Sequence, residues 1–227
     1  MRYLAVGDIH GCFQALAALA AFVPFQPEDV VITLGDYVNR GPNSCAVLDW
    51  LIAYQRRGKL VALRGNHELM MLQARESTEA FQRWMEYGGD ATLASYSPFG
   101  DAGRLIDVPD AHWQFLEETR GWFETARHFF VHANAYPDCP LEEQPDFMLY
   151  WESFNDPPAH DSGKIMVCGH TPQKSGRPRN IGHAVCIDTC AHGEGWLTCL
   201  DIASGKYWQA NQRGEMRCNW LEEEDAV

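Results

Sequence analysis

The chain has 227 residues, of which 46% are apolar and 12% aromatic, enough for one large domain with a buried core. Its 31 acidic residues outnumber 18 basic ones, which gives a net charge of −13 with neutral histidines. Such a surface repels nucleic-acid backbones, so we expect no nucleic-acid partner. A small phosphorylated substrate remains compatible with this charge, because bound metal ions can reverse the local field.

The cysteine pattern and the apolar runs bear on the compartment. Eight cysteines occur without a Cys-x-x-Cys pair, which argues against a thiolate zinc site. Several, such as Cys168, lie in apolar runs and suggest buried free thiols in a reducing compartment. The amino terminus begins a strand pattern directly, and no apolar run approaches roughly 18 residues. We expect a cytoplasmic protein that does not engage a membrane.

The amino-terminal third alternates short apolar runs with helical patterns. Strands are predicted at residues 2–6, 30–34 and 60–63, and helices at 13–22, from Ser44 onward and at 69–75. This β-α-β-α-β-α order predicts a parallel sheet with right-handed crossovers.

The pattern changes between about residue 76 and residue 121. Aromatic residues at helical spacing are followed by Gly88 and Gly89, a turn at 97–100 and a short helix at 110–118. We expect a small helical insertion over the functional site, with aromatic side chains that mostly form its own core.

The carboxyl-terminal half returns to strand patterns. A hairpin or a pair of edge strands is predicted at 122–126 and 128–133, a buried strand at 165–168, and antiparallel strands at 184–187, 196–200 and 206–209. An acidic, proline-containing loop is expected at 137–162, a basic segment at 173–180 and a frayed acidic end at 221–227.

Polar side chains follow three successive predicted strands. The segments are 7–11 (Gly-Asp-Ile-His-Gly), 35–41 (Gly-Asp-Tyr-Val-Asn-Arg-Gly) and 64–68 (Arg-Gly-Asn-His-Glu). Because open α/β sheets bind ligands at the carboxyl ends of their strands, these groups are expected to meet at one rim. With two later histidines, the candidate set is Asp8, His10, Asp36, Asn66, His67, His132 and His170.

This mixed oxygen and nitrogen set suits divalent ions such as Mn²⁺, Fe²⁺ or Zn²⁺. It is too large for one catalytic zinc, whereas two ions that share a carboxylate account for the number. Ions about 3.5–4 Å apart can clamp the attacking and leaving oxygens of a phosphoryl displacement. Arg40 and Arg64 flank two of the motifs and could hold phosphate oxygens. The other histidines (112, 128, 160, 183 and 192) are interpreted as structural, His192 least securely because it also follows a strand.

These motifs, together with 131–133 (Val-His-Ala), 169–171 (Gly-His-Thr) and 187–189 (Ile-Asp-Thr), resemble those of the calcineurin-like metallophosphoesterases. The spacing is most similar to the PPP-type branch, in particular the compact bacterial and bacteriophage lambda-type serine/threonine protein phosphatases. The resemblance spans roughly residues 1–205. It implies a four-layer αββα sandwich, here as a single domain over 1–227 with the insertion at about 76–121.

The resemblance also implies roles for individual residues. One divalent ion would be held by Asp8, His10 and Asp36, and the other by Asp36, Asn66, His132 and His170. In this family, hydroxide between the ions attacks phosphorus in line, and manganese is the usual activating ion in bacterial members. His67 would protonate the leaving oxygen, and Arg40 and Arg64 would bind the phosphate of a phosphorylated protein, peptide or small molecule.

Two positions depart from the family pattern. Asn39 stands where the family usually has an aspartate that supports His67, and an amide orients an imidazole without stabilising its cationic form. We therefore expect weaker general-acid catalysis, most costly for alkyl phosphates. The second departure is the absence of arginine near 151–153, where lambda-type enzymes carry one that helps to bind phosphate.

Two alternatives to a phosphomonoesterase remain at this point. Prokaryotic dinucleoside tetraphosphatases also lack the aspartate at the position of Asn39, and their motif continues into Arg-Gly-Pro as it does at 40–42. A hydrolase of dinucleoside polyphosphates (Ap4A-type) is therefore the main alternative. A non-catalytic metal-containing binding protein is a remote one, because all six metal-ligand positions are intact.

Overall fold

The computed structural model describes residues 1–97 and 102–222 and contains two β-sheets. The turn expected at 97–100 and most of the acidic end expected at 221–227 fall outside the described residues. The larger sheet has the order β11-β10-β9-β1-β2-β3, with β1 at Tyr3–Val6, β2 at Val30–Thr33, β3 at Lys59–Ala62, β9 at Leu197–Asp201, β10 at Lys206–Ala210 and β11 at Met216–Trp220. The smaller sheet has the order β4-β5-β6-β8-β7, with β4 at Trp122–Glu124, β5 at His128–Val131, β6 at Ile165–Cys168, β7 at Arg179–Asn180 and β8 at Ala184–Cys186.

The two sheets pack face to face through an apolar layer. Ala5 and Ile32 of the larger sheet share one buried cluster with Phe130 and Val167 of the smaller sheet. Strand β2, Val-Val-Ile-Thr, is buried along its whole length, as expected for a parallel strand covered on both faces. The central strands β1, β2 and β3 run parallel, so their carboxyl ends reach the same edge.

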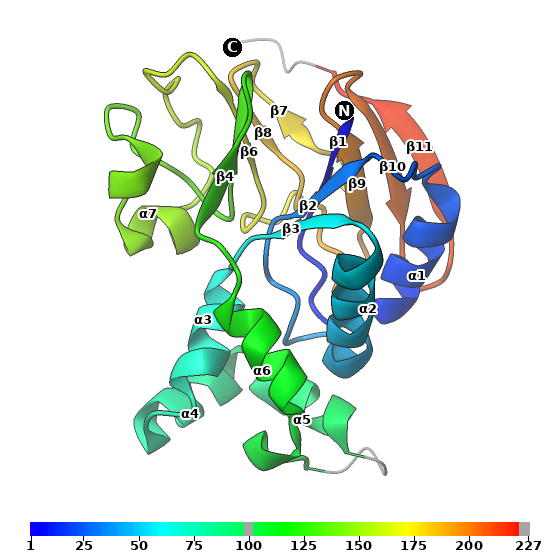
Figure 1. The fold of residues 1–227 in the computed structure, drawn as a ribbon, viewed down its shortest axis with the longest axis vertical. Helices are drawn as coiled ribbons and strands as arrows, with labels where there is room; N and C mark the ends of the chain where they lie inside the picture. The colour runs from blue at the N-terminus through cyan, green and yellow to red at the C-terminus, as the bar shows by residue number, and fades with distance from the viewer. Residues whose placement is uncertain (98–101, 223–227) are drawn as a thin grey trace.

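Helices and loops cover the outer faces. Helices α1 (Phe13–Phe22) and α2 (Ser44–Arg57) pack on the larger sheet, and α7 (Asp146–Tyr150) lies on the opposite side of the molecule with the smaller sheet, as Figure 1 shows. Residues Leu141–Glu143 form a 3₁₀ turn in this second outer layer. The predicted two-sheet α/β sandwich is therefore confirmed.

Three local predictions were wrong. Residues Ala184–Cys186 (β8) were expected to be an antiparallel strand. They pair in parallel with β6 and in antiparallel fashion with β7, because they belong to the smaller sheet and not to the larger one. The loop expected at 137–162 contains helix α7, which Pro145 precedes. The helix predicted from residue 69 begins at Asn66, since Gly65 acts as its N-cap.

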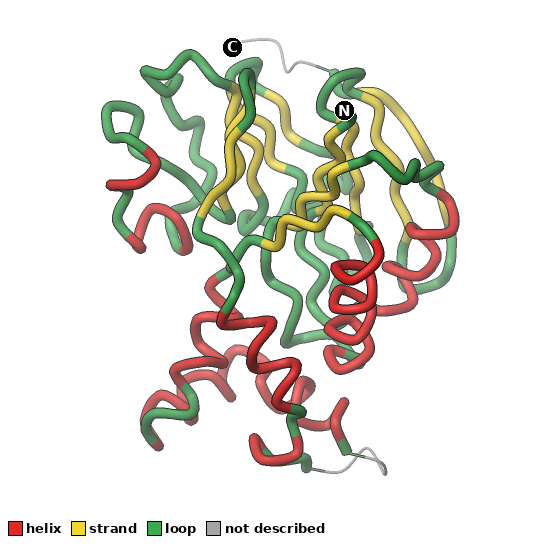
Figure 2. The backbone as a smooth tube through the Cα atoms, viewed as in Figure 1, coloured by secondary structure: helices red, strands yellow, loops and turns green. Residues whose placement is uncertain are grey.

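The insertion is helical, as predicted, and extends from the edge where the parallel strands end. It follows α3 (Asn66–Gln73) and comprises α4 (Thr78–Trp84), a π-helical turn at Met85–Gly89, α5 (Asp90–Tyr96), a 3₁₀ turn at Leu105–Asp107 and α6 (Asp110–Glu117). Figure 2 shows these red helices together beyond one end of the yellow strands. Its aromatic residues Trp84, Trp113 and Phe115 are buried in the same cluster as α1 and α2.

Candidate active site

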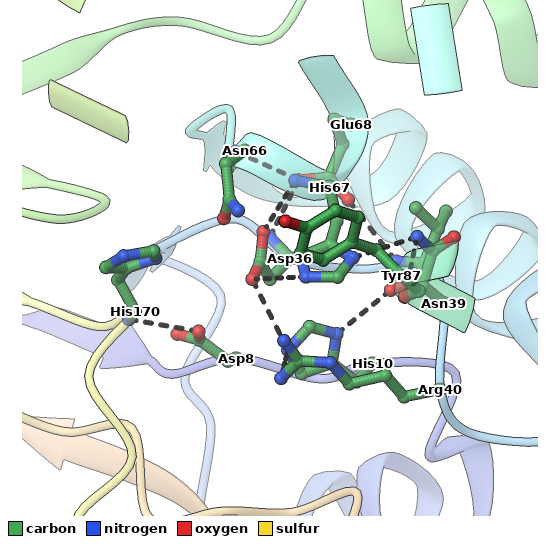
Figure 3. A network of polar contacts seen from close by, with 12 residues as sticks. Asp8, His10, Asp36, Asn39, Arg40, Asn66, His67, Glu68, Tyr87 and His170 are labelled. Atoms are coloured by element: carbon green, nitrogen blue, oxygen red, sulfur yellow. Dashed lines mark hydrogen bonds and ion pairs between the residues drawn. The ribbon is translucent and has the colours of Figure 1, made fainter. Parts of the chain in front are cut away.

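The site lies where five strands end. Asp8 follows β1, Asp36 follows β2, and Asn66 begins the helix after β3. From the smaller sheet, His132 follows β5 and His170 follows β6. Figure 3 shows Asp8, Asp36, Asn66 and His170 directed toward one another, with His10 and His67 beside them. The rim predicted from the three Gly-Asp and Gly-Asn motifs is therefore present, and the smaller sheet completes it.

Unusual backbone conformations are concentrated at this rim. Among the described residues, seven non-glycine residues have positive φ angles, and five of these belong to the site: His10, Asp36, Asn39, Arg40 and His170. Left-handed conformations cost free energy in residues with a Cβ atom and persist where the surroundings enforce them. The tight turns direct these side chains back across the ends of the strands.

Asp36 occupies the centre of the cluster. Its Oδ2 lies 3.3 Å from His10 Nε2, and its Oδ1 lies 3.5 Å from His132 Nε2. The carboxylate thus belongs to two donor groups, one with His10 and His67 and the other with His132 and His170. These positions are compatible with a carboxylate shared by two ions.

Backbone carbonyls assign the tautomers of three histidines. Because a carbonyl only accepts, His10 Nδ1–H donates to Val38 O at 3.0 Å, and His132 Nδ1–H donates to Leu34 O at 2.9 Å. His170 instead donates through Nε2–H to Trp151 O at 3.1 Å. The second nitrogen of each ring therefore carries a lone pair, and each of these nitrogens faces the cluster.

The lone pairs of His132 and His170 face each other with no donor between them, whereas His10 Nε2 faces Arg40 Nη1 at 3.2 Å. His132 Nε2 lies 3.2 Å from His170 Nδ1 and 3.1 Å from Asn66 Oδ1. Outside these two groups, Asp8 Oδ1 is buried and has no hydrogen-bond partner among the described residues, while its Oδ2 accepts from the His170 backbone amide at 3.0 Å. Converging acceptors without a donor are unfavourable unless a cation lies among them. The residues present therefore fit two divalent cations.

Burial shifts the pKa values of the cluster toward neutral forms. It raises the pKa of Asp36 to about 7 and that of Asp8 well above its usual range, the latter also through repulsion from Asp188 and Asp36. Burial lowers the pKa of His132 to about 4, and burial together with repulsion from His132 lowers that of His170 to about 3. Neutral imidazoles are the form that binds metal ions.

Glu68 supports the centre from behind. Its buried carboxylate accepts from the backbone amides of Asp36, Tyr37, Val38 and Gly65 at 2.7–3.2 Å. These bonds connect the turn that carries Asp36 to the start of α3. A Cβ atom at position 65 would lie 2.1 Å from Asp36 Oδ1, so only glycine permits this approach.

His67 and Asn39 form a pair beside the bridging carboxylate. Asn39 Nδ2 lies 2.8 Å from His67 Nδ1, and the Asn39 side-chain oxygen accepts from Trp84 and Thr92 of the insertion. His67 Nε2 is buried without a hydrogen-bond partner in the described structure and lies 3.9 Å from Asp36 Oδ2. Burial and the positive charge of Arg40 lower the pKa of His67 to about 2.

The two candidate phosphate-binding arginines occupy different environments. Arg40 Nη1 lies 3.2 Å from His10 Nε2, so its guanidinium faces the cluster. Arg64 instead donates through Nε and Nη2 to Thr119 and to carbonyls at the carboxyl end of α6, including Glu117 O at 2.8 Å. The structure brings Arg40 to the site, whereas most donors of Arg64 hold the end of the insertion.

Sequence reasoning missed several residues of the site. The structure places His192, interpreted as structural, with its ring 4.8 Å from that of His10 and its Nε2 3.5 Å from Arg40 Nη1. Asp188 is buried, with an unpartnered Oδ2, and its burial raises its pKa to about 6. The position of both after β8, another strand that ends at the rim, was the available signal. Among the other histidines, His112 is buried and hydrogen-bonded, as expected.

The chain was compared with known proteins. A family model described as calcineurin-like phosphoesterase matches residues 1–195. Serine/threonine-protein phosphatase 1 of Salmonella typhimurium is 42% identical over 204 residues, which cover 87% of this chain and 90% of the relative. A symmetrical bis(5'-nucleosyl)-tetraphosphatase of Pseudomonas fluorescens is 33% identical over 144 residues, which cover 63% of this chain and 46% of the relative.

A solved structure has the same fold. The cold-active protein-tyrosine phosphatase of a psychrophilic Shewanella gives a TM-score of 0.65 at 15% identity, with 96% of this chain and 80% of that chain covered. The chain belongs to the calcineurin-like phosphoesterases, and it is a metal-dependent hydrolase of phosphorylated substrates. Members of this family bind two divalent metal ions, and the two donor groups around Asp36 are compatible with such a centre. No described helix has the length and apolar character needed to cross a membrane.

Proposed function

We propose that this protein is a phosphomonoesterase of the serine/threonine protein phosphatase type, acting on phosphorylated proteins or peptides. The observation that carries the proposal is that Asp36 belongs to both donor groups of the site. It is supported by the 42% identity of the chain to a serine/threonine phosphatase over most of the length of both proteins. The free cysteines, eight in the described residues, are consistent with a cytoplasmic location.

We assign two divalent ions, Mn²⁺ first and Fe²⁺ or Zn²⁺ as alternatives, to the two donor groups. Asp8, His10 and Asp36 would hold one, with Asp8 as a ligand in place of His67, which we assign to proton donation. Asp36 would share the other with the group Asn66, His132 and His170. When bound, the ions supply a nucleophile at neutral pH and neutralise charge on the phosphoryl group. The oxygen and nitrogen donors accept several metals, so the choice among them rests on the resemblance.

The protein's own side chains would bind and orient the substrate. Arg40 faces the cluster and can donate a guanidinium fork to phosphate oxygens. His67 lies beside the bridging carboxylate, where its Nε2 can donate to the leaving oxygen. Arg64 would contribute through Nη1, because its other donors are engaged at α6.

A second candidate function is hydrolysis of dinucleoside polyphosphates. Two observations favour it: the similarity to a bis(5'-nucleosyl)-tetraphosphatase and the amide of Asn39 behind His67. A nucleotide phosphate leaves without protonation, so it needs no strong acid. Against it, the matched region spans less than half of that relative, whereas the phosphatase is matched along 90% of its length.

The deciding experiment compares specificity constants for manganese-stimulated hydrolysis of four substrates: a phosphoserine peptide, a phosphotyrosine peptide, para-nitrophenyl phosphate and diadenosine tetraphosphate. We expect a phosphopeptide to exceed the dinucleotide. Dominance of diadenosine tetraphosphate would replace the proposal by its alternative. A separate experiment tests the remote alternative. If the variants Asp36→Ala and His132→Ala keep the biological function unchanged, a non-catalytic binding protein would be favoured.

A further inference from the structure

The amide of Asn39 lies between the helical insertion and His67. Its Oδ1 accepts from Trp84 Nε1 and from Thr92 Oγ1, both at 2.9 Å. Its Nδ2 lies 2.8 Å from His67 Nδ1 and donates to Tyr87 O at 3.3 Å. Asn39 is fully buried, so water cannot replace these hydrogen-bond partners. Figure 3 shows Asn39 and Tyr87 next to the ring of His67.

The two ends of the amide are distinguished by their neighbours. An indole N–H only donates, so the atom that faces Trp84 must be the oxygen. A backbone carbonyl only accepts, so the atom that faces Tyr87 O must be the nitrogen. A flipped amide would place donor against donor and acceptor against acceptor in a buried position, which is strongly unfavourable. The orientation of the amide is therefore fixed from the insertion.

This orientation determines which nitrogen of His67 carries the proton. Both hydrogens of the Asn39 NH₂ group are donors, so His67 Nδ1 must accept, and the ring proton lies on Nε2. Nε2 is also the nitrogen without a partner among the described residues, 3.9 Å from Asp36 Oδ2. Tyr87, whose ring centroid lies 6.4 Å from that of His67, is 42% exposed. His67 thus presents a fixed N–H to the substrate side of the site.

We propose that Trp84 and Thr92 are positioning residues, which fix the Asn39 amide and thereby hold His67 as a hydrogen-bond donor through Nε2. The inference rests on the proposed function and names the substrate class within it. In the hydrolysis, a water oxygen bonds to phosphorus and one of its protons stays with the phosphate product. The bond to the leaving oxygen breaks with its electron pair on that oxygen, which takes up the other proton. A hydrogen bond suffices for a phenolate or a phosphate, whereas an alkoxide requires a full proton. Compared with a serine/threonine phosphatase that carries an aspartate at this position, the site therefore loses less activity on aryl phosphates, including phosphotyrosine, than on alkyl phosphates such as phosphoserine.

The tautomer is measured directly by nitrogen-15 NMR of histidine-labelled protein. The sample is the full chain, metal-free and then loaded with diamagnetic Zn²⁺, and His67→Gln assigns the resonances. We expect a protonated Nε2 and an unprotonated Nδ1 for His67 in both states. In Trp84→Phe with Thr92→Val, the amide can turn, and the His67 signals should shift toward a mixture of tautomers. Protonated Nδ1 in the wild-type protein would overturn the proposal whatever the protein hydrolyses.

Activity provides the second readout. We expect the ratio of specificity constants for phenyl phosphate over a primary alkyl phosphate to fall at least tenfold in the double variant. Trp208→Phe is the matched control, a buried tryptophan in β10, and should leave the ratio unchanged. An unchanged ratio in the double variant would contradict the positioning role. If the double variant does not fold, Thr92→Val alone is subject to the same two criteria. Failure to hydrolyse any phosphomonoester would refute the proposed function but leave the NMR result standing.

Discussion

Asp36 and Asn39 lie within one turn, and together they set the chemistry of the site. Asp36 connects the two donor groups, while Asn39 contacts His67 at 2.8 Å. An aspartate at position 39 would accept from His67 Nδ1–H and stabilise the imidazolium, which an amide does not. We therefore propose that Asn39 determines whether His67 donates a hydrogen bond or a proton.

The variant Asn39→Asp tests this difference. We expect its specificity constant for an alkyl phosphate to rise about tenfold or more, with little change for an aryl phosphate, because a positioned general acid contributes on the order of 10²–10⁴-fold where a proton is needed. The measurement is steady-state hydrolysis of both substrates with manganese. Equal changes for the two substrates would contradict the assignment.

Two variants distinguish the roles of Arg40 and Arg64. We expect Arg40→Ala to weaken inhibition by inorganic phosphate about tenfold or more, because its guanidinium faces the donor cluster. Arg64→Ala should change phosphate inhibition less and lower the thermal midpoint instead, since it removes bonds to Thr119 and to the end of α6. Phosphate inhibition and thermal unfolding of both variants are the measurements, and the reverse ranking would refute the distinction.

At the level of elements, the start of α3 depends on one carboxylate. Glu68 accepts from four backbone amides, which join the turn after β2 to the N-terminus of the helix. The helix N-terminus also favours a negative charge in its first turn. Asn66 and His67 are consequently held in a rigid frame before any ligand binds.

Glu68→Gln should lower the free energy of unfolding by about 2–3 kcal/mol, because it weakens charged hydrogen bonds and turns an NH₂ group toward buried donors. Urea unfolding measures the loss. Glu76→Gln, an exposed position just after α3, is the matched control and should change stability by less than about 0.5 kcal/mol. Similar losses in both variants would show that the frame does not depend on Glu68.

The order of strands and helices in the first 75 residues followed from apolar periodicity, and the strand-end rule placed Asp8, Asp36 and Asn66 together. Side-chain contacts that depend on tertiary packing could not be predicted from the sequence pattern. The aromatic side chains of the insertion were expected to be buried, and Trp84 is buried, but in a cluster shared with α1 and α2. Its indole N–H also donates to Asn39, and nothing in a helical stripe indicates that bond. Arg64 lies in a site motif, but its donors face α6, which is distant in the sequence.

The packing of the whole molecule brings buried carboxylates together, with the guanidinium of Arg40 facing them. Asp8, Asp36, Asp188 and Glu68 all have raised pKa values, chiefly through burial. The two sheets share one apolar core, so we propose that residues 1–227 form a single domain. Ionisation of these buried carboxylates should then lower the stability of the entire fold.

Metal-free protein should lose stability as the pH rises from about 4 to about 7. The pKa of Asp36 is raised to about 7 and that of Asp188 to about 6, both from 3.8. A raised pKa gives a contribution that is complete below the unfolded value and is lost as the pH rises through the folded value. Thermal unfolding in the presence of a chelator should show a falling midpoint, and Asp36→Asn should reduce the fall. An equal fall in wild type and variant would contradict this origin.

The central claim is a two-metal centre joined by Asp36, and metal content measured together with phosphatase activity tests it most directly. Wild-type protein, reconstituted with Mn²⁺ and desalted, should hold two ions per chain by elemental analysis. Asp36→Asn should hold fewer than two and lose at least about 10³-fold in specificity constant toward para-nitrophenyl phosphate, as expected when the metal clamp on both reacting oxygens is lost. Full activity with one ion or none, or an active Asp36→Asn variant, would contradict the account.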